Sequence, residues 1–187
     1  MTIKSIKTGW TGISAAAGYP QLGDFESIAT ATVGSGGQAI IDFNSIPLTY
    51  NHLQLRCSFL GDTATGYDVS MQLNSDSQSN YRWHRLYGNG TSASAQGSVS
   101  ATTGMYVAAD AARTLYPVAA VIDILDYTNT NKYKTVRNFT GHDQNGSGVV
   151  TLWSNLWMKT NAVSSIKIVV ASNNLAQYSH FALYGIR

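Results

Sequence analysis

Paired carboxylates carry glycoside hydrolysis, so Asp123 and Asp126 are the first residues to weigh. They lie three positions apart in the apolar run 118–127. Successive side chains of a strand point to opposite faces, so residues three apart cannot face one substrate. We therefore expect structural roles: Asp126 caps the turn at Asn129, and Asp123 pairs with an Arg or Lys side chain.

The histidines show no spacing typical of a metal site or a catalytic dyad. His142 and Asp143 lie in the Gly-rich segment 141–148, which predicts a surface turn. His52, His84 and His180 are scattered along the chain. A zinc site needs clustered ligands, and the sequence predicts none.

Two further groups of polar residues have simple structural interpretations. Asn74, Asp76, Gln78 and Asn80 alternate oxygen-bearing side chains, but they lack the glycine and the terminal glutamate of a calcium loop. Cys57 belongs to an alternating apolar set, which predicts a packed core thiol. No catalytic constellation can be assembled, so we expect a protein that is not an enzyme and needs no cofactor or metal.

The aromatic residues allow two interpretations. Rings flanked by Asn, Arg and His can stack on sugars, whereas the same rings fill sandwich cores and subunit interfaces. The set that raises this question is Tyr81, Trp83, Tyr87, Trp153 and Trp157. We favour the core or an interface, and a sugar-binding groove is the alternative.

The densest group of interface-type side chains lies in the segment 80–87. Large aromatic and Arg side chains are typical anchors of protein interfaces. The residues predicted to contact a second copy, or a glycan, are Tyr81, Arg82, Trp83, Arg85 and Tyr87. Strand alternation would place Tyr81, Trp83, Arg85 and Tyr87 on one face, but a short helical turn fits the segment nearly as well.

Composition limits the classes of partner. The chain has 187 residues, 12% of them charged, with a formal net charge of +2. Its cations are not clustered, so no nucleic-acid surface is expected. There is no apolar window of about 18 residues, so no membrane span is expected. The single cysteine excludes an internal disulfide, which suits synthesis in a reducing cytoplasm.

Period-two alternation and short Gly/Asn turns predict an all-β fold of about nine or ten antiparallel strands. The closing stretch 164–187 contains two such runs, 166–170 and 178–186, and the remaining strands should pack on this pair. The other predicted strands are 27–33, 39–43, 52–59, 67–73, 118–127, 133–139 and 149–157. This pattern indicates a two-sheet antiparallel sandwich, similar to a jelly roll.

Several segments carry more specific or more ambiguous predictions. The tight turn 34–37 predicts a hairpin between the first two strands. The segment 88–104 should be an exposed loop or a weak edge strand. For 105–114, a short helix and a strand fit equally well.

Residues 1–24 differ from the rest in their glycine punctuation. They predict an extended N-terminal arm that contacts a neighbouring molecule, leaving residues 25–187 as the β-sandwich domain. The expected anchors of the arm are Trp10, Ile13, Tyr19 and Leu22.

Three stretches resemble a family of small virion structural proteins of tailed bacteriophages. They are 25–37 continuing into 46–56, then 122–135 (IDILDYTNTNKYKT), and the ending 181–186 (FALYGI). The resemblance covers about residues 25–187 and rests on strand and turn patterns.

The resemblance implies a β-sandwich that assembles into the particle as a homo-oligomer, with a trimer favoured. We expect a non-enzymatic decoration or cement module on the capsid, located in the virion after synthesis in the host cytoplasm. Its partners would be other copies of itself and virion proteins such as the major capsid protein. A tail-fibre or baseplate module that binds host-surface glycan is the alternative, and a glycan-degrading enzyme is the weakest hypothesis.

Overall fold

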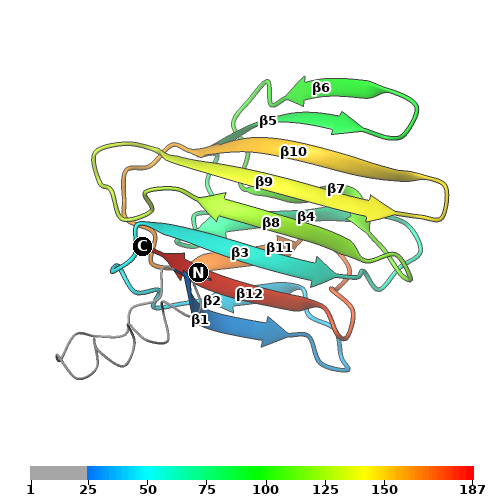
Figure 1. The fold of residues 1–187 in the computed structure, drawn as a ribbon, viewed down its shortest axis with the longest axis horizontal. Helices are drawn as coiled ribbons and strands as arrows, with labels where there is room; N and C mark the ends of the chain where they lie inside the picture. The colour runs from blue at the N-terminus through cyan, green and yellow to red at the C-terminus, as the bar shows by residue number, and fades with distance from the viewer. Residues whose placement is uncertain (1–24) are drawn as a thin grey trace, which may run out of the picture.

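Two antiparallel sheets account for all the strands in the computed structural model, which describes residues 25–187 (Figure 1). The large sheet has eight strands in the order β1-β12-β3-β8-β9-β10-β5-β6, and the small sheet has four in the order β2-β11-β4-β7. The predicted all-β sandwich is therefore confirmed. The predicted arm, with Trp10, Ile13, Tyr19 and Leu22, lies outside the described residues.

The strand bounds agree closely with the alternation in the sequence. In chain order the strands are β1 Phe25–Thr32, β2 Ile40–Phe43, β3 His52–Phe59, β4 Tyr67–Leu73, β5 Tyr81–Gly88, β6 Ala93–Gly97, β7 Met105–Ala112, β8 Val118–Ile124, β9 Lys134–Asp143, β10 Gly148–Trp157, β11 Ile166–Val170 and β12 His180–Ile186. The described residues form no helix, and none of them forms an apolar helical span long enough to cross a membrane.

Eight of the strands make a jelly roll. Setting β5, β6, β9 and β10 aside leaves β1-β12-β3-β8 facing β2-β11-β4-β7, with the chain passing repeatedly between the two sheets. The four remaining strands come from two insertions, one between β4 and β7 and one between β8 and β11. Both insertions extend the large sheet beyond the small one, and we call β9, β10, β5 and β6 the extension.

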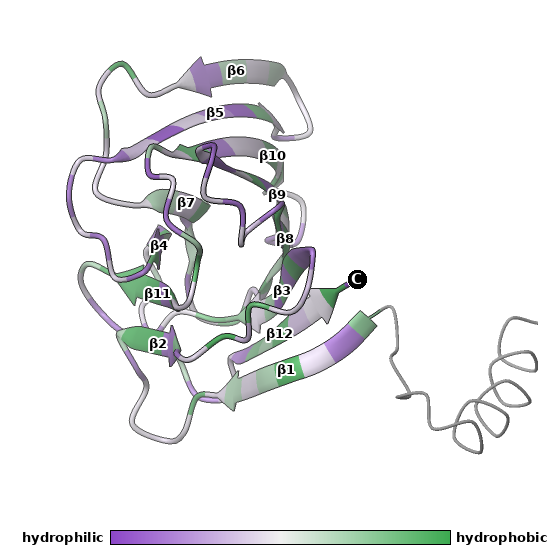
Figure 2. Cartoon of the chain, turned by 90° about the vertical axis from the view of Figure 1, so that its left-hand side faces the viewer, coloured by the Kyte–Doolittle hydropathy of each residue, from purple (hydrophilic) through white to green (hydrophobic). Residues whose placement is uncertain are grey.

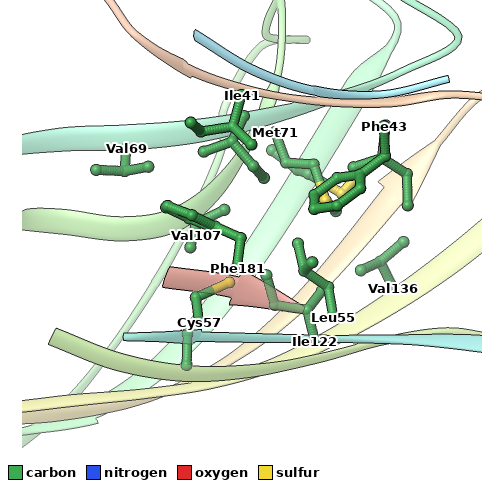
Figure 3. Close-up of a cluster of buried hydrophobic side chains, with 14 of the residues drawn as sticks. Ile41, Phe43, Leu55, Cys57, Val69, Met71, Val107, Ile122, Val136 and Phe181 are labelled. Atoms are coloured by element: carbon green, nitrogen blue, oxygen red, sulfur yellow. The ribbon is translucent and has the colours of Figure 1, made fainter. Parts of the chain in front are cut away.

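The core lies between the two sheets, as the side view and the close-up show (Figures 2 and 3). Each sheet turns its apolar alternation inward, so that Leu55 and Ile122 from the large sheet lie across from Ile41 and Met71 of the small one. Cys57 is buried in this layer, which confirms the predicted core thiol, and burial raises its pKa.

The closing stretch occupies a central place, as predicted. Strand β11 lies between β2 and β4 in the small sheet, and β12 lies between β1 and β3 in the large one. The two runs therefore sit in opposite sheets. In the large sheet the first and last strands are partners, with Phe25 opposite Ile186.

The predicted hairpin between the first two strands is wrong. Strand β1 pairs with β12, whereas β2 pairs with β11 in the other sheet. The turn closes as expected, with the Gly37 N–H donating to Gly34 O at 3.1 Å, but it carries the chain across the sandwich. A tight turn between two strands fits either a hairpin or a corner, and only the strand partners decide between them.

The structure decides two open alternatives and changes two expectations. The segment 88–104 contains the edge strand β6, and 105–114 contains the strand β7 and no helix. The described residues therefore form twelve strands and not nine or ten. The predicted turn 141–148 is shorter, because β9 runs to Asp143 and β10 begins at Gly148. His142 and Asp143 are therefore strand residues, not turn residues.

Loops and β7, the edge strand of the small sheet, cover the inner face of the extension (Figure 2). The fully buried Lys134 of β9 ties two of these loops together. Its Nζ donates to Asn129 O at 2.5 Å, Lys132 O at 3.1 Å and Thr160 O at 3.0 Å. Burial and the nearby Lys132 lower the pKa of Lys134.

We predict that Leu183→Asp abolishes soluble folding. Leu183 is fully buried in β12, and burial of such a side chain contributes about 1.5–3 kcal/mol before the cost of burying a charge is added. Soluble yield and circular dichroism give the measurement. Tyr184→Asp, which changes the next residue on the opposite face, is the control and should fold. A Leu183→Asp protein that melts cooperatively near the parent temperature would contradict the prediction.

Candidate functional site

The outer face of the large sheet, the side turned away from the small sheet, carries a line of exposed apolar side chains. The register places Val121 beside Phe139 and Phe139 beside Leu152. It places Leu152 in turn beside Leu86. These four residues, which we call the apolar row, are 38–56% exposed. Contiguous exposed apolar surface is uncommon on monomeric proteins and marks interaction sites.

A polar row runs parallel to the apolar row, two residues further along each strand. It consists of Asp123, Arg137, Ser154 and His84, paired in that order across β8, β9, β10 and β5. The expected Arg or Lys partner of Asp123 is wrong, since its Oδ1 accepts a hydrogen bond from Gln54 Nε2 at 2.7 Å. The guanidinium of Arg137, directly opposite Asp123, makes no hydrogen bond or ion pair within residues 25–187.

Two hollows open on the outer face of the extension. The first, of about 460 Å³, is lined by Leu86, Leu152 and Arg137 together with His84 and Ser154. The second, of about 420 Å³, shares His84 and Ser154 with the first. Apolar and cationic groups therefore lie side by side, an arrangement that suits a partner with apolar and acidic groups of its own.

The five residues predicted for an interface all lie on β5, but they point to two sides of the sheet. The segment is a strand and not a helical turn. Tyr81, Trp83, Arg85 and Tyr87 face inward, so the predicted common face is confirmed. Arg82 points to the outer face, where its Nη1 donates to Val99 O at 2.8 Å.

Tyr81 cannot contact a partner, because its side chain is fully buried inside the chain. Its hydroxyl donates to Asp76 O at 2.9 Å and accepts the Leu73 N–H at 3.1 Å. The assignment of Tyr81 to an interface is therefore wrong. Trp157 is also buried, and its ring lies 6.5 Å from that of Tyr81.

A second group of rings packs between β5, β10 and β7. Trp83, Trp153 and Tyr106 lie 5.2–5.5 Å apart, centroid to centroid. Trp153, Trp157 and Tyr81 are buried, so most of the aromatic set belongs to the interior of the domain. These three rings are not accessible to a sugar. Buried polar atoms accompany them: the indole N–H of Trp83 and of Trp153 and the Asn155 amide have no partner within the described residues.

Arg85 packs against the Trp153 ring of this cluster and against the ring of Tyr87. Its guanidinium carbon lies 5.1 Å from the Trp153 ring centroid and 4.5 Å from that of Tyr87. Its Nε donates to Gln96 Oε1 at 2.9 Å, which ties β5 to β6. Whether Arg82, Trp83, Arg85 and Tyr87 contact a partner stays a prediction.

Asp126 has a structural role in the predicted turn, but it closes the turn through its backbone and not through its side chain. Its carbonyl accepts the Asn129 N–H at 3.0 Å, which closes the turn. The side chain pairs with Lys132, and its Oδ1 lies 3.6 Å from His52 Nδ1. The hydrogen bond and charge of Lys132 lower the pKa of Asp126.

The histidines do not come together in the structure. His52, His84 and His180 lie on β3, β5 and β12, and the Nδ1 of His180 is 2.9 Å from Thr32 Oγ1. Burial and the charge of Arg113 lower the pKa of His142. In the part of the chain that the structure describes, no group of three His, Cys, Asp or Glu side chains could hold a metal ion.

The loop between β4 and β5 uses its oxygens for internal hydrogen bonds. Asn74 Oδ1 accepts the Ser164 N–H at 2.8 Å. Asp76 Oδ2 accepts from Trp157 Nε1 and from Asn80 Nδ2, each at 2.8 Å. Burial alone would raise the pKa of Asp76, but these hydrogen bonds outweigh it and lower the pKa. The oxygens that suggested a calcium loop thus hold β4, β5 and β10 together.

Sequence reasoning missed the apolar row. The signal was present, because β10 alternates two apolar sets: Trp153 and Trp157 point inward, while Val150 and Leu152 remain about half exposed. A strand that is apolar on both faces either is buried on both or offers one face to a partner. The predicted sandwich gave no reason to expect the second case.

No family model matches the chain, and no curated protein matches it.

We predict that Asp76→Ala lowers the free energy of unfolding by about 1–3 kcal/mol, since it leaves the buried Trp157 Nε1 without an acceptor. Urea unfolding measures the change. Asp42→Ala is the control: Asp42 lies in an exposed ion pair with Lys167, 3.9 Å from its Nζ, and the substitution should cost at most about 1 kcal/mol.

The wild type and Asp76→Ala can also be compared as a function of pH. The pKa of Asp76 is lowered in the folded state, so its contribution is complete above the ordinary Asp pKa of about 3.9 and declines as the pH falls below it. The difference between wild type and Asp76→Ala should therefore shrink in acid. A difference that stays constant down to the acid unfolding of the protein would exclude an ionised Asp76 as the acceptor.

Proposed function

We propose that the chain is a non-enzymatic virion structural protein of a tailed bacteriophage, a homo-oligomeric decoration or cement module on the capsid. The observation that carries the proposal is the apolar row, a line of four exposed apolar side chains across four strands of a sheet. A module that functions by assembly needs such a surface. The resemblance of residues 25–37, 46–56, 122–135 and 181–186 to phage structural proteins is the reason for proposing a phage particle.

The dimensions of the outer face suit a stable protein contact. Eight strands spaced about 4.8 Å apart span roughly 34 Å, and about seven residues of strand cover roughly 23 Å. The resulting face is on the order of 800 Å², the area that one partner buries in an interface of standard size. Neighbouring virion proteins such as the major capsid protein are the proposed partners, and the arm 1–24 is proposed to add a second contact.

Self-association remains part of the proposal, with a three-fold arrangement favoured by the resemblance. Tyr81 is withdrawn from the predicted interface, while Arg82 is kept because it faces outward beside the second hollow. Many copies of a modest contact give strong attachment on a particle, so no single residue needs to dominate.

We predict that Phe139→Asp combined with Leu86→Asp abolishes attachment to particles while the domain still folds. Both side chains are 56% exposed, so folding should lose at most about 1 kcal/mol for each substitution. Co-sedimentation with purified phage particles measures attachment, and immunogold labelling of the wild type shows where it binds.

The matched control is Ser35→Asp combined with Ser172→Asp, two exposed positions in loops that lie outside the strands of the outer face. This variant should attach like the wild type. If the Phe139/Leu86 variant attaches at full occupancy, the outer face is not the contact. If the wild type is absent from purified virions, the virion proposal fails.

Binding of host-surface glycan, as in a tail-fibre or baseplate module, is the second candidate. One observation favours it: the hollow of about 460 Å³ has the size of a small-ligand site and offers Arg137, His84 and Ser154 as polar groups. A glycan array with the wild type and Arg137→Ala separates the two functions. Binding that Arg137→Ala abolishes would favour the tail module, and no binding to the array would favour the capsid module.

A further inference from the structure

Strand β6 forms one rim of the large sheet, and among residues 25–187 it has a strand on one side only. It pairs with β5 from His84–Gly97 to Gly88–Ala93, and no strand follows it in the sheet order. Figures 1 and 2 both show β6 at the end of the extension, away from the small sheet. Its outer side is therefore open to another strand.

The hydrogen-bond register identifies which backbone groups are free. The Ser98 N–H donates to Trp83 O at 2.9 Å, and the Asn89 N–H donates to Ser92 O at 3.2 Å. Antiparallel pairs alternate between bonded and non-bonded, so Ser94 and Gln96 also bond to β5. Ala93, Ala95 and Gly97 consequently direct their N–H and C=O groups away from the sheet.

The other three sheet edges carry features that hinder pairing. Strand β1 has a register shift between Ser27 and Ala29 and carries Glu26. Strand β2 has four residues and carries the charged Asp42. The β4–β7 ladder has two register shifts, and Asp110 of β7 is in a left-handed conformation with a φ of 49°.

Strand β6 has none of these features. Its register with β5 is unbroken, and the sequence from Gly88 to Gly104 contains no proline and no charged residue. The side chains next to the free groups are the two methyls of Ala93 and Ala95 and the hydrogen of Gly97. An incoming strand would meet neither a charge nor a bulky side chain.

We propose that β6 pairs antiparallel with β6 of a second copy of this chain, about a two-fold axis at Ala95. Ala95 then faces Ala95 of the partner subunit, and Ala93 faces Gly97 of the partner subunit. Self-pairing brings two identical strands together, so a strand with a net charge would be repelled by its copy, and the uncharged β6 is not. The result is one continuous sheet across both copies.

Side chains add to the proposed contact. On the inner side of the sheet, Ser94 faces Gln96 of the partner subunit. Arg85 can only donate, so the oxygen of Gln96 is occupied by Arg85 Nε at 2.9 Å, which leaves the Gln96 Nε2 donor for the Ser94 hydroxyl across the axis. The contact does not rest on the virion proposal, and in a trimer it would join two trimers, because it is two-fold.

Oxidative cross-linking of Ala95→Cys tests the register. In the proposed pair the two Ala95 Cα atoms lie about 5.5 Å apart, within the range of a disulfide. The only native cysteine, Cys57, is buried. Ala95→Cys should give a covalent dimer on a non-reducing gel. Ala93→Cys, on the same face two residues away, is the matched control and should not cross-link. Equal cross-linking of both variants would overturn the register.

Removing one backbone donor tests the pairing. Ala95→Pro deletes an N–H that faces solvent in the single chain, a position that an edge strand tolerates. Light scattering should show half the wild-type mass, whatever other contacts exist, with the melting curve showing a folded domain. Ala95→Ser keeps the N–H and should keep the wild-type mass. A wild type that remains monomeric at every concentration, or an Ala95→Pro protein of unchanged mass, would overturn the proposal.

Discussion

The pairing of β10 with β5 is the interaction on which the unusual part of this sandwich depends. It runs without a break from Val150–Gly88 to Trp157–Tyr81 and joins two insertions that are far apart in the sequence. Without it, the strands β5 and β6 would have no sheet to extend. This one ladder positions half of the apolar row and the residues that line both hollows. It also places β6 at the edge of the sheet, because β6 pairs with β5.

The extension has an interior of a different kind from the jelly roll. Between the sheets the buried side chains are almost all apolar, whereas under the extension they include Lys134, Asn138 and Asn155. Loops and a single strand cover this region, and their carbonyl groups need donors. Lys134 and Asn138 supply donors, with Asn138 Nδ2 donating to Val107 O at 2.7 Å. Such a polar interior specifies one arrangement of the loops at the cost of desolvating a charge.

Local patterns predicted the strands well and their partners poorly. The run 166–170 and the run 67–73 coincide with β11 and β4, because clean alternation leaves one way to bury an apolar face. The predicted hairpin 27–43 was wrong because the same turn residues occur in a hairpin and in a connection that crosses between two sheets. For the predicted site, the strand was the correct one of two alternatives, but Tyr81 is internal. A ring that carries a polar group has the same sequence pattern in a core and at an interface. The apolar row depends on which strands become neighbours, and no single segment contains that information.

Phe25 and Ile186 face each other across the β1–β12 ladder, so the described domain starts and finishes at one place on its surface. A few residues of linker would close it into a ring, and new ends opened in an exposed turn such as 144–147 would leave every ladder intact. The same geometry would allow the domain to be inserted into a loop of a longer polypeptide. The two ends of the opened loop would need to be separated by only about the distance between two neighbouring strands. Modularity of this kind comes from the topology alone and is independent of what the outer face binds.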